Sequence, residues 1–450
     1  MDDALNLPPI EEIELMIAEG RLDDLQNLLA PIHPADIAVL LEEVETETAV
    51  TIFELLPIEI ASEVLDETGG QVRQELVEKV DDERLADLLD ELPMDDAVEF
   101  LEDLPDEISG RLIGLMEPEE AAEVQELLAY EEETAGRLMT RDVVALRRQW
   151  TVSETFDYLR SLEDAETLHY LYVVDRDNKL IGVVPLRQLV LSQPDATVES
   201  LMSSDIVSIN VNADQEELAE LVSRYDYFVV PVVNDANELL GVVTVDDVLD
   251  IFEEEVTEDI QRLGGSEPLD QPYFAVSAFQ IVRKRIGWLL LLFVASTLSG
   301  EVIRMFQNEL DLVVALGFFI TLITGTGGNA GSQTVSTIIR AITLDEVRLS
   351  NLMDAWRREV SVGLMLGLVM GAVGIIRALL WHTGYEVALV VALTLPLVVI
   401  WSTTVATVIP ILADRFHIDP TVISGPMIAT IVDATGLMIY FLLAKFILGI

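Results

Sequence analysis

The chain has 450 residues, a formal net charge of -54 and no cysteine. The lack of cysteine excludes a disulfide framework and a thiolate metal site. Nearly all the negative charge lies before Gly287, and the rest of the chain is apolar, so we expect an acidic water-soluble part, then a membrane part, and no nucleic-acid partner.

Residues 1–130 are predicted to form an all-α superhelical domain. Apolar residues recur at helical spacing, and proline opens successive helices in the segments that begin at His33, Leu56, Leu92 and Leu104. Proline suits the first helical turn, and the carboxylates that follow it suit the positive end of the helix dipole. Stacked helical hairpins are the expected result. Because the acidic start lacks the features of a secretory signal, we expect this domain to stay in the cytoplasm.

Residues 131–252 contain a repeat of a different kind. The two copies include Leu180-Ile181-Gly182-Val183-Val184 and Leu239-Leu240-Gly241-Val242-Val243, each part of a strand–turn–strand–helix pattern. Each copy also opens with Leu-Met, at Leu138 and Leu201. This order resembles a tandem pair of CBS α/β domains, which we assign to 131–200 and 201–252. The resemblance implies a pseudo-twofold module whose clefts often hold adenine nucleotides.

Two residues in comparable positions of the CBS copies are candidates for nucleotide binding. The Arg187 guanidinium would meet phosphate, and the Tyr227 ring would stack on adenine, which makes ATP a candidate regulator. The alternative places Arg187 on a solvated helix and Tyr227 in the core. Neither copy has a Gly-rich phosphate loop, so hydrolysis is not expected.

A connecting helix toward the membrane is predicted over residues 253–280. Carboxylates crowd its approach and its first turns: Asp246, Asp247, Asp250, Glu254, Glu255, Glu258 and Asp259. Like charges at this spacing repel one another unless cations lie among them. We expect the helical domain to present Glu59, Asp95, Asp96 and Glu99 across a cleft, so that cations bridge the two faces. The alternative is a solvated acidic face.

The last part, residues 281–450, is predicted to be a transmembrane domain of five helices. Its five apolar runs, each about long enough to cross ~30 Å of hydrocarbon, cover residues 286–306, 312–342, 360–381, 387–412 and 421–450. Arginine and lysine cluster just before the first run and between the second and third, which favours the cytoplasm for both places. We therefore expect a multi-pass plasma-membrane protein with its C-terminus outside.

A carboxylate, Asp433, lies near the middle of the fifth run. An ionised group at bilayer depth costs on the order of 2.5 to 3.5 kcal/mol, so such groups usually face a water-filled pathway. The Gly-rich segment 325–331 in the second run is expected to break its helix and expose carbonyl oxygens. The alternatives are a structural Asp433 paired with Lys445 or Arg340, and glycines that serve only helix packing.

Several motifs in register resemble the MgtE family of magnesium channels over essentially the whole chain. They are Gly327-Gly328-Asn329-Ala330-Gly331-Ser332-Gln333, Asp419-Pro420, Ser424-Gly425-Pro426, Asp433, Tyr130-Glu131-Glu132, Gly136-Arg137-Leu138-Met139 and Thr244-Val245-Asp246-Asp247-Val248. The resemblance implies a homodimer that imports Mg²⁺ through an axial pore lined by the second and fifth spans. A hydrated Mg²⁺ ion prefers oxygen ligands. The pore candidates are Asp433, Asn329, Gly328, Ala429, Thr430 and Gly425.

The resemblance also implies regulatory metal ligands that close the pore when cytosolic Mg²⁺ is high. They are Glu59, Gly136 through its carbonyl, Glu216, Asp226, Asp247, Asp250, Glu255, Glu258 and Asp259. The residues of the helical domain add Asp95, Asp96 and Glu99 as candidates. Cation binding would favour the compact arrangement, and the connecting helix would transmit closure to the pore.

Two other classes of function remain open from the sequence. One is a CBS-regulated transporter of another solute, such as another divalent cation; the other is a membrane-anchored nucleotide sensor that transports nothing. A plain anchor would not need an intramembrane Asp433. No enzymatic activity is expected, because the four histidines are scattered and no nucleophile–base pair is apparent.

Overall fold

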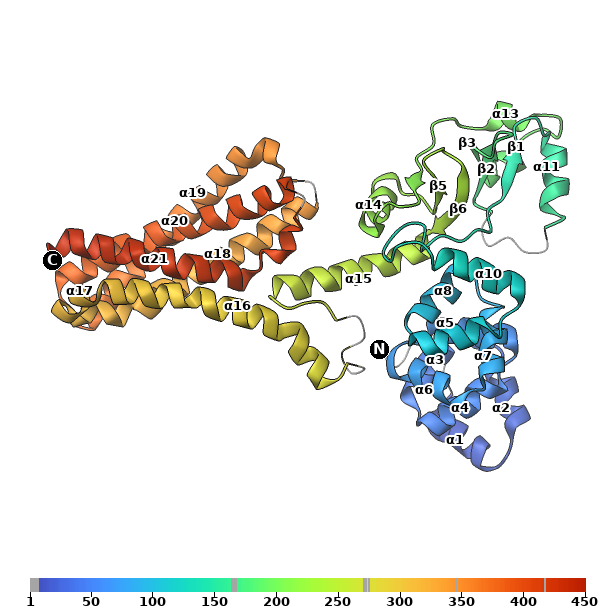
Figure 1. The fold of residues 1–450 in the computed structure, drawn as a ribbon, viewed down its shortest axis with the longest axis horizontal. Helices are drawn as coiled ribbons and strands as arrows, with labels where there is room; N and C mark the ends of the chain where they lie inside the picture. Colours follow the sequence, from blue (N-terminus) through green and yellow to red (C-terminus); the bar gives the residue numbers. More distant parts are fainter. Residues whose placement is uncertain (1–7, 163–167, 270–272, 274–275, 345, 417) are drawn as a thin grey trace. The chain divides into compact units, whose positions relative to one another are not determined.

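The computed structural model describes residues 8–162, 168–269, 273, 276–344, 346–416 and 418–450. The chain divides into two compact units, Met1–Glu255 and Val256–Ile450, and Figure 1 shows the helices and strands of both. The first unit is a helical domain followed by two small sheets, and the second is a bundle of long helices.

The helical domain consists of ten short helices: α1 (Ile10–Ala18), α2 (Leu22–Leu29), α3 (Pro34–Glu43), α4 (Thr46–Leu55), α5 (Ile58–Glu67), α6 (Gly70–Lys79), α7 (Asp82–Leu89), α8 (Met94–Glu102), α9 (Asp106–Ile113) and α10 (Pro118–Leu127). A proline is the N-cap or the first helical residue of α3, α5, α8, α9 and α10. Helix α3 packs on α5, α5 on α7, and α7 on α9. Each odd-numbered helix from α5 to α9 therefore packs on the odd-numbered helix before it. This stacking confirms the predicted superhelical domain.

The two sheets repeat one topology. In the first, β1 (Ala145–Arg147) runs parallel to β2 (Tyr170–Val174), which pairs antiparallel with β3 (Leu180–Pro185). In the second, β4 (Ile209–Asn210), β5 (Val229–Val233) and β6 (Leu239–Thr244) are arranged alike. The associated helices are α11 (Val152–Leu159), α12 (Leu186–Val190), α13 (Val198–Leu201) and α14 (Gln215–Tyr225).

Reciprocal hydrogen bonds join the two sheets about a pseudo-twofold axis. The Asn178 side-chain amide donates to the Leu239 carbonyl at 3.0 Å, and the Asn237 amide donates to the Leu180 carbonyl at 2.9 Å. Both asparagines have a positive φ, which suits the tight turn between the strands. The predicted pair of α/β domains is confirmed.

Helix α15 (Val245–Leu263) follows β6 and leads into the second unit. The Asp247 carboxylate caps its start by accepting hydrogen bonds from the Thr244 amide at 3.1 Å and the Thr244 hydroxyl at 2.6 Å. The helix therefore begins within the second CBS copy, eight residues before the predicted connecting helix, and ends well before residue 280.

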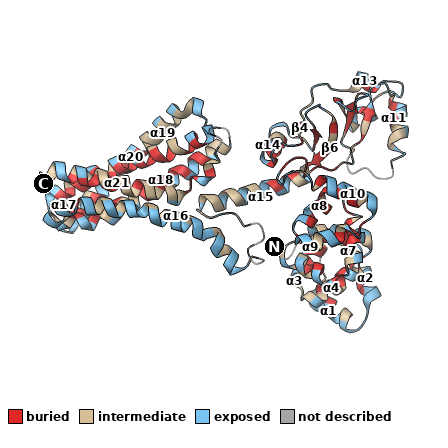
Figure 2. Ribbon diagram, viewed as in Figure 1, coloured by how far each residue is buried: buried red, intermediate tan, exposed pale blue. Residues whose placement is uncertain are grey.

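Among its described residues, the second unit contains five helices long and apolar enough to cross a membrane, in agreement with the five predicted spans. They are α16 (Ala278–Met305), α18 (Ile320–Thr343) with the preceding η1 (Val314–Phe319), α19 (Leu352–Leu380) with η2 (Leu349–Asn351), α20 (Tyr385–Arg415) and α21 (Gly425–Leu448). The short α17 (Gln307–Leu312) and η3 (Pro420–Val422) connect them. Helix α16 has no buried residue and stands out as exposed in Figure 2.

Glycine allows α19 to lie unusually close to α20. A Cβ on Gly367 would lie 2.6 Å from the Pro396 Cα, and one on Gly371 would lie 2.6 Å from the Ala392 carbonyl oxygen. Small residues of this kind let membrane helices pack backbone to backbone. Pro396 is inside α20, beside the backbone of Gly367 on the neighbouring helix.

The predicted glycine break in the second span is wrong. Helix α18 is continuous from Ile320 to Thr343 and passes through the whole Gly-rich segment. A Cβ on Gly327 would lie 2.7 Å from Val398 Cγ1, and one on Gly331 would lie 2.6 Å from Ser402 Oγ. The glycines are therefore needed for close contact with α20 and α21, and helical hydrogen bonds keep their backbone from opening.

Candidate ion pathway and regulatory carboxylates

Asp433 is half-buried on α21, against the glycine face of α18. Its Oδ1 lies 3.7 Å from where a Gly328 Cβ would be, and Ala429 Cβ lies 3.3 Å from the same position. Within the described part of the chain, Asp433 makes no hydrogen bond or ion pair. A half-buried intramembrane carboxylate with no protein partner has its lone pairs available for a hydrated cation.

The alternative in which Lys445 neutralises Asp433 does not hold. Lys445 Nζ instead forms an ion pair of 2.8 Å with Glu309 Oε1 of α17. This contact holds the pKa of the Glu309 carboxyl below its usual value, chiefly through the hydrogen bond from Lys445. Arg340 likewise makes no ion pair in the ranges that the structure describes.

Helix α18 carries a polar exposed stripe beside Asp433. Its members recur about every four residues, which places them on one face: Thr321, Gly325, Asn329, Gln333, Thr337 and Arg340. The opposite face of the same helix is buried. A membrane helix does not present such a row of amides and hydroxyls to lipid, so this face adjoins water or another protein surface.

The other pore candidates lie along the same two helices. The Ser332 hydroxyl donates to the Gly425 carbonyl at 3.2 Å, which joins the start of α21 to α18. The Thr430 hydroxyl donates to the Pro426 carbonyl at 2.9 Å, so only its lone pairs remain for a hydrated ion. Asn329 belongs to the polar stripe. The structure therefore brings Gly328, Ala429 and Asp433 together, and places Asn329, Thr430 and Gly425 on their flanks.

In the first unit, carboxylates from three helices act on one another. They are Asp66 of α5, Glu99 of α8 and Asp250 of α15. Burial raises the pKa of Asp66 to about 6, and the charges of Glu67, Asp250 and Asp246 raise it further against the opposing effect of Arg73. Burial, aided by the charges of Asp66, Asp250 and Asp103, raises the pKa of Glu99 to about 7 against the opposing effect of Arg73. Such raised values mark a place where negative charge lacks compensation.

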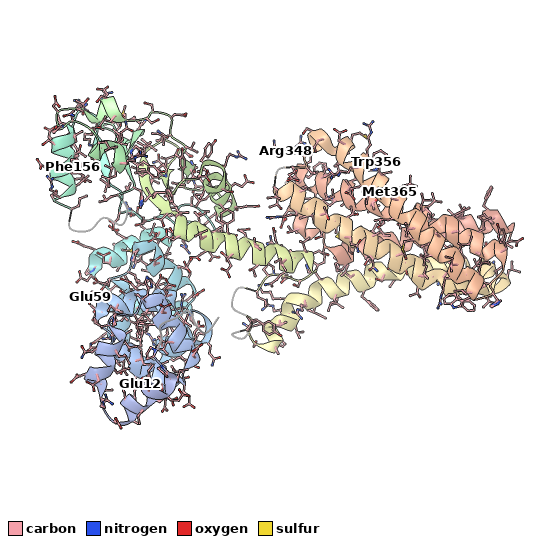
Figure 3. The ribbon with its side chains drawn as sticks, turned by 180° about the vertical axis from the view of Figure 1, so that it is seen from behind. Glu12, Glu59, Phe156, Arg348, Trp356 and Met365 are labelled. Atoms are coloured by element: carbon pink, nitrogen blue, oxygen red, sulfur yellow. The ribbon has the colours of Figure 1, made fainter. Side chains whose placement is uncertain are left out.

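Sequence reasoning found Glu99 and Asp250 but missed Asp66. Asp66 lies two helical turns after Glu59 on α5, and that helical spacing was the available signal. Glu59, which Figure 3 labels, is itself exposed. Asp95 is buried at the start of α8, whereas Asp96 is half-buried.

The other predicted ligands of the first unit lie in different local environments. The Gln215 amide donates to Glu255 Oε1 at 2.8 Å, and the Glu216 amide donates to the Asp214 side chain at 2.9 Å at the start of α14. Asp226 ends α14 in a left-handed conformation. A Cβ on Gly136 would lie 2.6 Å from Val211 Cγ2, so this position admits only glycine.

Glu258 and Asp259 belong to the second unit, near Asp419 and Arg262. Burial raises the pKa of Asp259, and the carboxylates of Asp419 and Glu258 add to the effect while Arg262 and Arg340 oppose it. Over the residues that the structure describes, no three histidines or carboxylates lie close enough together to hold a metal ion. The predicted ligands are thus distributed over both units.

Tyr227, one of the two proposed nucleotide residues, belongs to an aromatic cluster in the CBS pair. Tyr227 packs edge-on against Tyr170 with ring centroids 6.2 Å apart and stacks on Tyr225 at 5.7 Å. His169 stacks on Phe228 at 5.8 Å. Arg187 is exposed on α12 and makes no ion pair in the described ranges. Arg187 therefore lies on a solvated helix, as the alternative interpretation expects, whereas Tyr227 is half-buried and does not lie fully in the core.

Models of known families match three parts of the chain. The model described as a divalent cation transporter, MgtE, matches residues 320–443, the MgtE intracellular N domain matches 32–133, and CBS domains match 135–194 and 198–254. The described metal-site candidates of both units lie within or beside these segments.

Curated relatives align with nearly the whole chain. The magnesium transporter MgtE of Thermus thermophilus is 38% identical over 96% of this chain and 97% of that protein, and the one from Bacillus subtilis is 31% identical over 96% of each. Both are named as transporters and not as enzymes, in agreement with the expectation that the chain is not an enzyme.

Solved structures match the soluble part. The crystal structure of the cytosolic domain of the Mg²⁺ channel MgtE in complex with ATP is 38% identical, with a TM-score of 0.51 over 53% of this chain and 98% of that one. The soluble part of a magnesium transporter is 28% identical, with a TM-score of 0.51 over 54% of this chain and 97% of that one. From these matches and the arrangement of its helices, the chain belongs to the MgtE family of divalent cation transporters.

Proposed function

We propose that this membrane protein imports Mg²⁺ into the cytoplasm through a pathway lined by α18 and α21. The observation that carries the proposal is Asp433, an intramembrane carboxylate without a protein partner in the described chain, beside the polar stripe of α18. Relatives of similar length are named magnesium transporters. Mg²⁺ dehydrates reluctantly, so a carboxylate that attracts the ion through its water shell suits it.

A homodimer would complete this pathway. One copy leaves the polar stripe of α18 uncovered, and a second copy related by twofold symmetry would cover it with the same stripe. Two Asp433 carboxylates would then face one hydrated cation and balance its two charges. This arrangement explains why an isolated negative charge is tolerated in the membrane.

Uptake by purified protein in vesicles tests the proposal. We expect a Mg²⁺-sensitive dye inside the vesicles to report uptake that Asp433→Ala abolishes. Asp414→Asn is the matched control, since it removes an exposed carboxylate of the same unit at the end of α20. Vesicles with the unaltered chain that admit no Mg²⁺ would refute the function, and normal uptake by Asp433→Ala would refute the role of this residue.

Cytosolic Mg²⁺ would close the pathway by binding among the carboxylates of the first unit and α15. The raised pKa values of Asp66, Glu99 and Asp250 support this, because uncompensated charge favours a bound divalent cation. The candidate ligands are those listed from the sequence, with Asp66 added. A cation that binds the compact arrangement better shifts the population toward it.

A triple neutralisation of Asp247, Asp250 and Glu255 tests this regulation. We expect the variant to conduct at internal Mg²⁺ concentrations that close the unaltered channel. Asp23→Asn, Asp24→Asn and Glu11→Gln together provide a control that removes three charges from the far end of the helical domain, where no site is proposed. Patch recordings with unchanged closure by Mg²⁺ in the first variant would rule the carboxylates out.

ATP is proposed as a ligand of the CBS pair, next to Arg187 and Tyr227. The aromatic cluster around Tyr227 offers ring faces for adenine, and a similar cytosolic domain has been solved with ATP. Calorimetry with the purified chain should give a heat of binding at millimolar ATP that Arg187→Gln weakens. No heat in the unaltered chain would exclude the site.

We further propose that the first unit lies in the cytoplasm and the C-terminus outside. The basic residues near the start of α16 and around η2, including Arg348 in Figure 3, support a cytoplasmic position for both segments, and five spans then place Ile450 on the other side. The polar stripe of α18 disfavours the alternative of a non-transporting anchor, because an anchor gains nothing from it.

A further inference from the structure

A guanidinium bridges the end of α15 to the segment that leads into α21. Arg262 forms an ion pair with Glu258 one turn earlier on α15, and its Nη1 lies 2.8 Å from Oδ2 of Asp419. All three side chains are partly shielded from solvent, and Glu258 is the least exposed at 17%. A planar guanidinium can hold two carboxylates at fixed angles, which a lysine ammonium cannot do equally well.

Asp419 is itself fixed to η3, the short helix that precedes α21. Its carboxylate accepts hydrogen bonds from the Thr421 amide at 2.8 Å and from the buried Thr421 hydroxyl at 2.7 Å. These bonds cap η3, and α21 begins three residues after η3 ends. Asp433 lies eight residues into α21, about 12 Å along its axis.

Backbone hydrogen bonds close the turn that ends α15. The Gly265 amide donates to the Arg262 carbonyl at 2.8 Å, and the Ser266 amide donates to the Gln261 carbonyl at 3.1 Å. Gly265 has a φ of +75°, a left-handed conformation that glycine adopts without strain. Its Cβ position lies 3.5 Å from Ser424 Oγ, and Leu263 packs against the core of the helix bundle.

Because carboxylates surround it, Arg262 determines whether the end of α15 attracts or repels Asp419. Asp259 lies near both Glu258 and Asp419, so three carboxylates meet at the joint. Arg262 makes ion pairs with two of them, whereas Arg340 interacts only at longer range. Without Arg262, repulsion between the end of α15 and Asp419 would replace attraction.

We propose that Arg262 is the positioning residue that couples α15 to the pore helix, so that a displacement of the last turn of α15 moves Asp419 and the start of α21. This inference rests on the proposed Mg²⁺ transport and its closure by cytosolic Mg²⁺. Arg262 touches no transported ion in this scheme. It acts through Asp419 and the cap of η3.

The test compares Arg262→Gln and Arg262→Lys with the unaltered chain in vesicles loaded with stepped concentrations of Mg²⁺. We expect Arg262→Gln to keep uptake at low internal Mg²⁺ but to need at least about fivefold more Mg²⁺ for half-closure, with Arg262→Lys in between. Arg357→Gln is the matched control, since Arg357 pairs with Asp354 at 3.8 Å on the exposed surface of the same unit. Half-closure of Arg262→Gln at the unaltered concentration would overturn the inference.

A cross-linking experiment distinguishes loss of the Arg262 contact from poor folding of the variant. Because the chain has no cysteine, Arg262→Cys with Asp419→Cys provides one unique pair of thiols. We expect this double variant to resist closure by Mg²⁺ until a short bifunctional thiol reagent joins the two positions, which should restore closure. Cross-linked protein that still resists closure would also overturn the inference. Failure of the unaltered chain to transport Mg²⁺, or to close with it, would instead refute the proposed function.

Discussion

Gly325 and Gly331 lie six residues apart on α18 but have different surroundings. A Cβ on Gly331 would lie 2.6 Å from Ser402 Oγ and 2.8 Å from Ile428 Cγ2, whereas one on Gly325 would have nothing within 4 Å. We predict that Gly331→Ala destabilises the bundle by about 1 to 3 kcal/mol through overpacking. Gly325→Ala should leave the thermal midpoint in detergent unchanged or higher, because alanine favours helix. Equal midpoints for the two variants would contradict this packing.

Glu99 and Asp66 make the stability of the first unit depend on pH. Their pKa values of about 7 and about 6 exceed the usual 4.5 and 3.8, so the native state holds protons that the unfolded chain releases. Without Mg²⁺, the free energy of unfolding should therefore fall as pH rises through this range, from about 4 to about 7.

Glu99→Gln should flatten that dependence and raise the thermal midpoint of the first unit at neutral pH. Added Mg²⁺ should stabilise the unaltered chain more than the variant, because the ion compensates the ionised carboxylate. Glu91→Gln is the control, since Glu91 is an exposed carboxylate before α8. Thermal scans with and without Mg²⁺ from acid to neutral pH check both expectations, and a parallel slope in Glu99→Gln would contradict them.

At the scale of elements, α18 and α19 differ in the surface that they expose. Its exposed stripe is polar, whereas the exposed face of α19 is apolar, with Met365 (Figure 3) 61% exposed. The length and mean hydropathy of each apolar run predicted both as spans, since the average composition of a run suffices for that. The sequence did not identify the stripe, because its six members are spread among apolar residues and glycine.

Cysteine substitution along α18 tests which surface meets water. In this cysteine-free chain, a cysteine at Thr321, Gly325 or Gln333 should react with a water-soluble thiol reagent. Met365→Cys on α19 should react more slowly by at least about tenfold, because a thiol in hydrocarbon does not ionise. Mg²⁺ should slow the reaction at Gln333 if the ion passes there. Equal rates at Met365 and the stripe would place α18 against lipid.

In the third span, hydropathy alone did not predict where the helix begins. The apolar run begins at Val360, but α19 begins at Leu352 and includes Glu359. The Thr334 hydroxyl of α18 donates to Glu359 Oε2 at 3.4 Å, and Trp356 Nε1 donates to Thr404 Oγ1 of α20 at 3.3 Å. Polar side chains that find partners on neighbouring helices can extend a membrane helix beyond its apolar run.

At the scale of the whole molecule, the proposed dimer gives a mass prediction. Native mass spectrometry of the detergent-solubilised chain should show twice the 49.8 kDa of one copy. Gln333→Leu with Asn329→Leu should weaken the dimer or block the pathway, because the polar stripe would lose its hydrogen-bonding groups. A monomer that transports Mg²⁺ at the unaltered rate would contradict the shared pore.

The sequence by itself determined the class of each segment. Helical periodicity with Pro-opened helices, the duplicated strand pattern and five apolar runs each depend on local spacing, so they predict the helical domain, the CBS pair and the spans. It also singled out Asp433, because a charge inside an apolar run is visible without any contact.

Only the tertiary structure decided which residues meet. It placed Asp66 with Glu99 and Asp250, paired Lys445 with Glu309 and Arg262 with Asp419, and turned the expected glycine break into a packed, continuous helix. These contacts join residues far apart in the chain, and side-chain charge and volume act through distance in space. Local spacing carries no record of that distance.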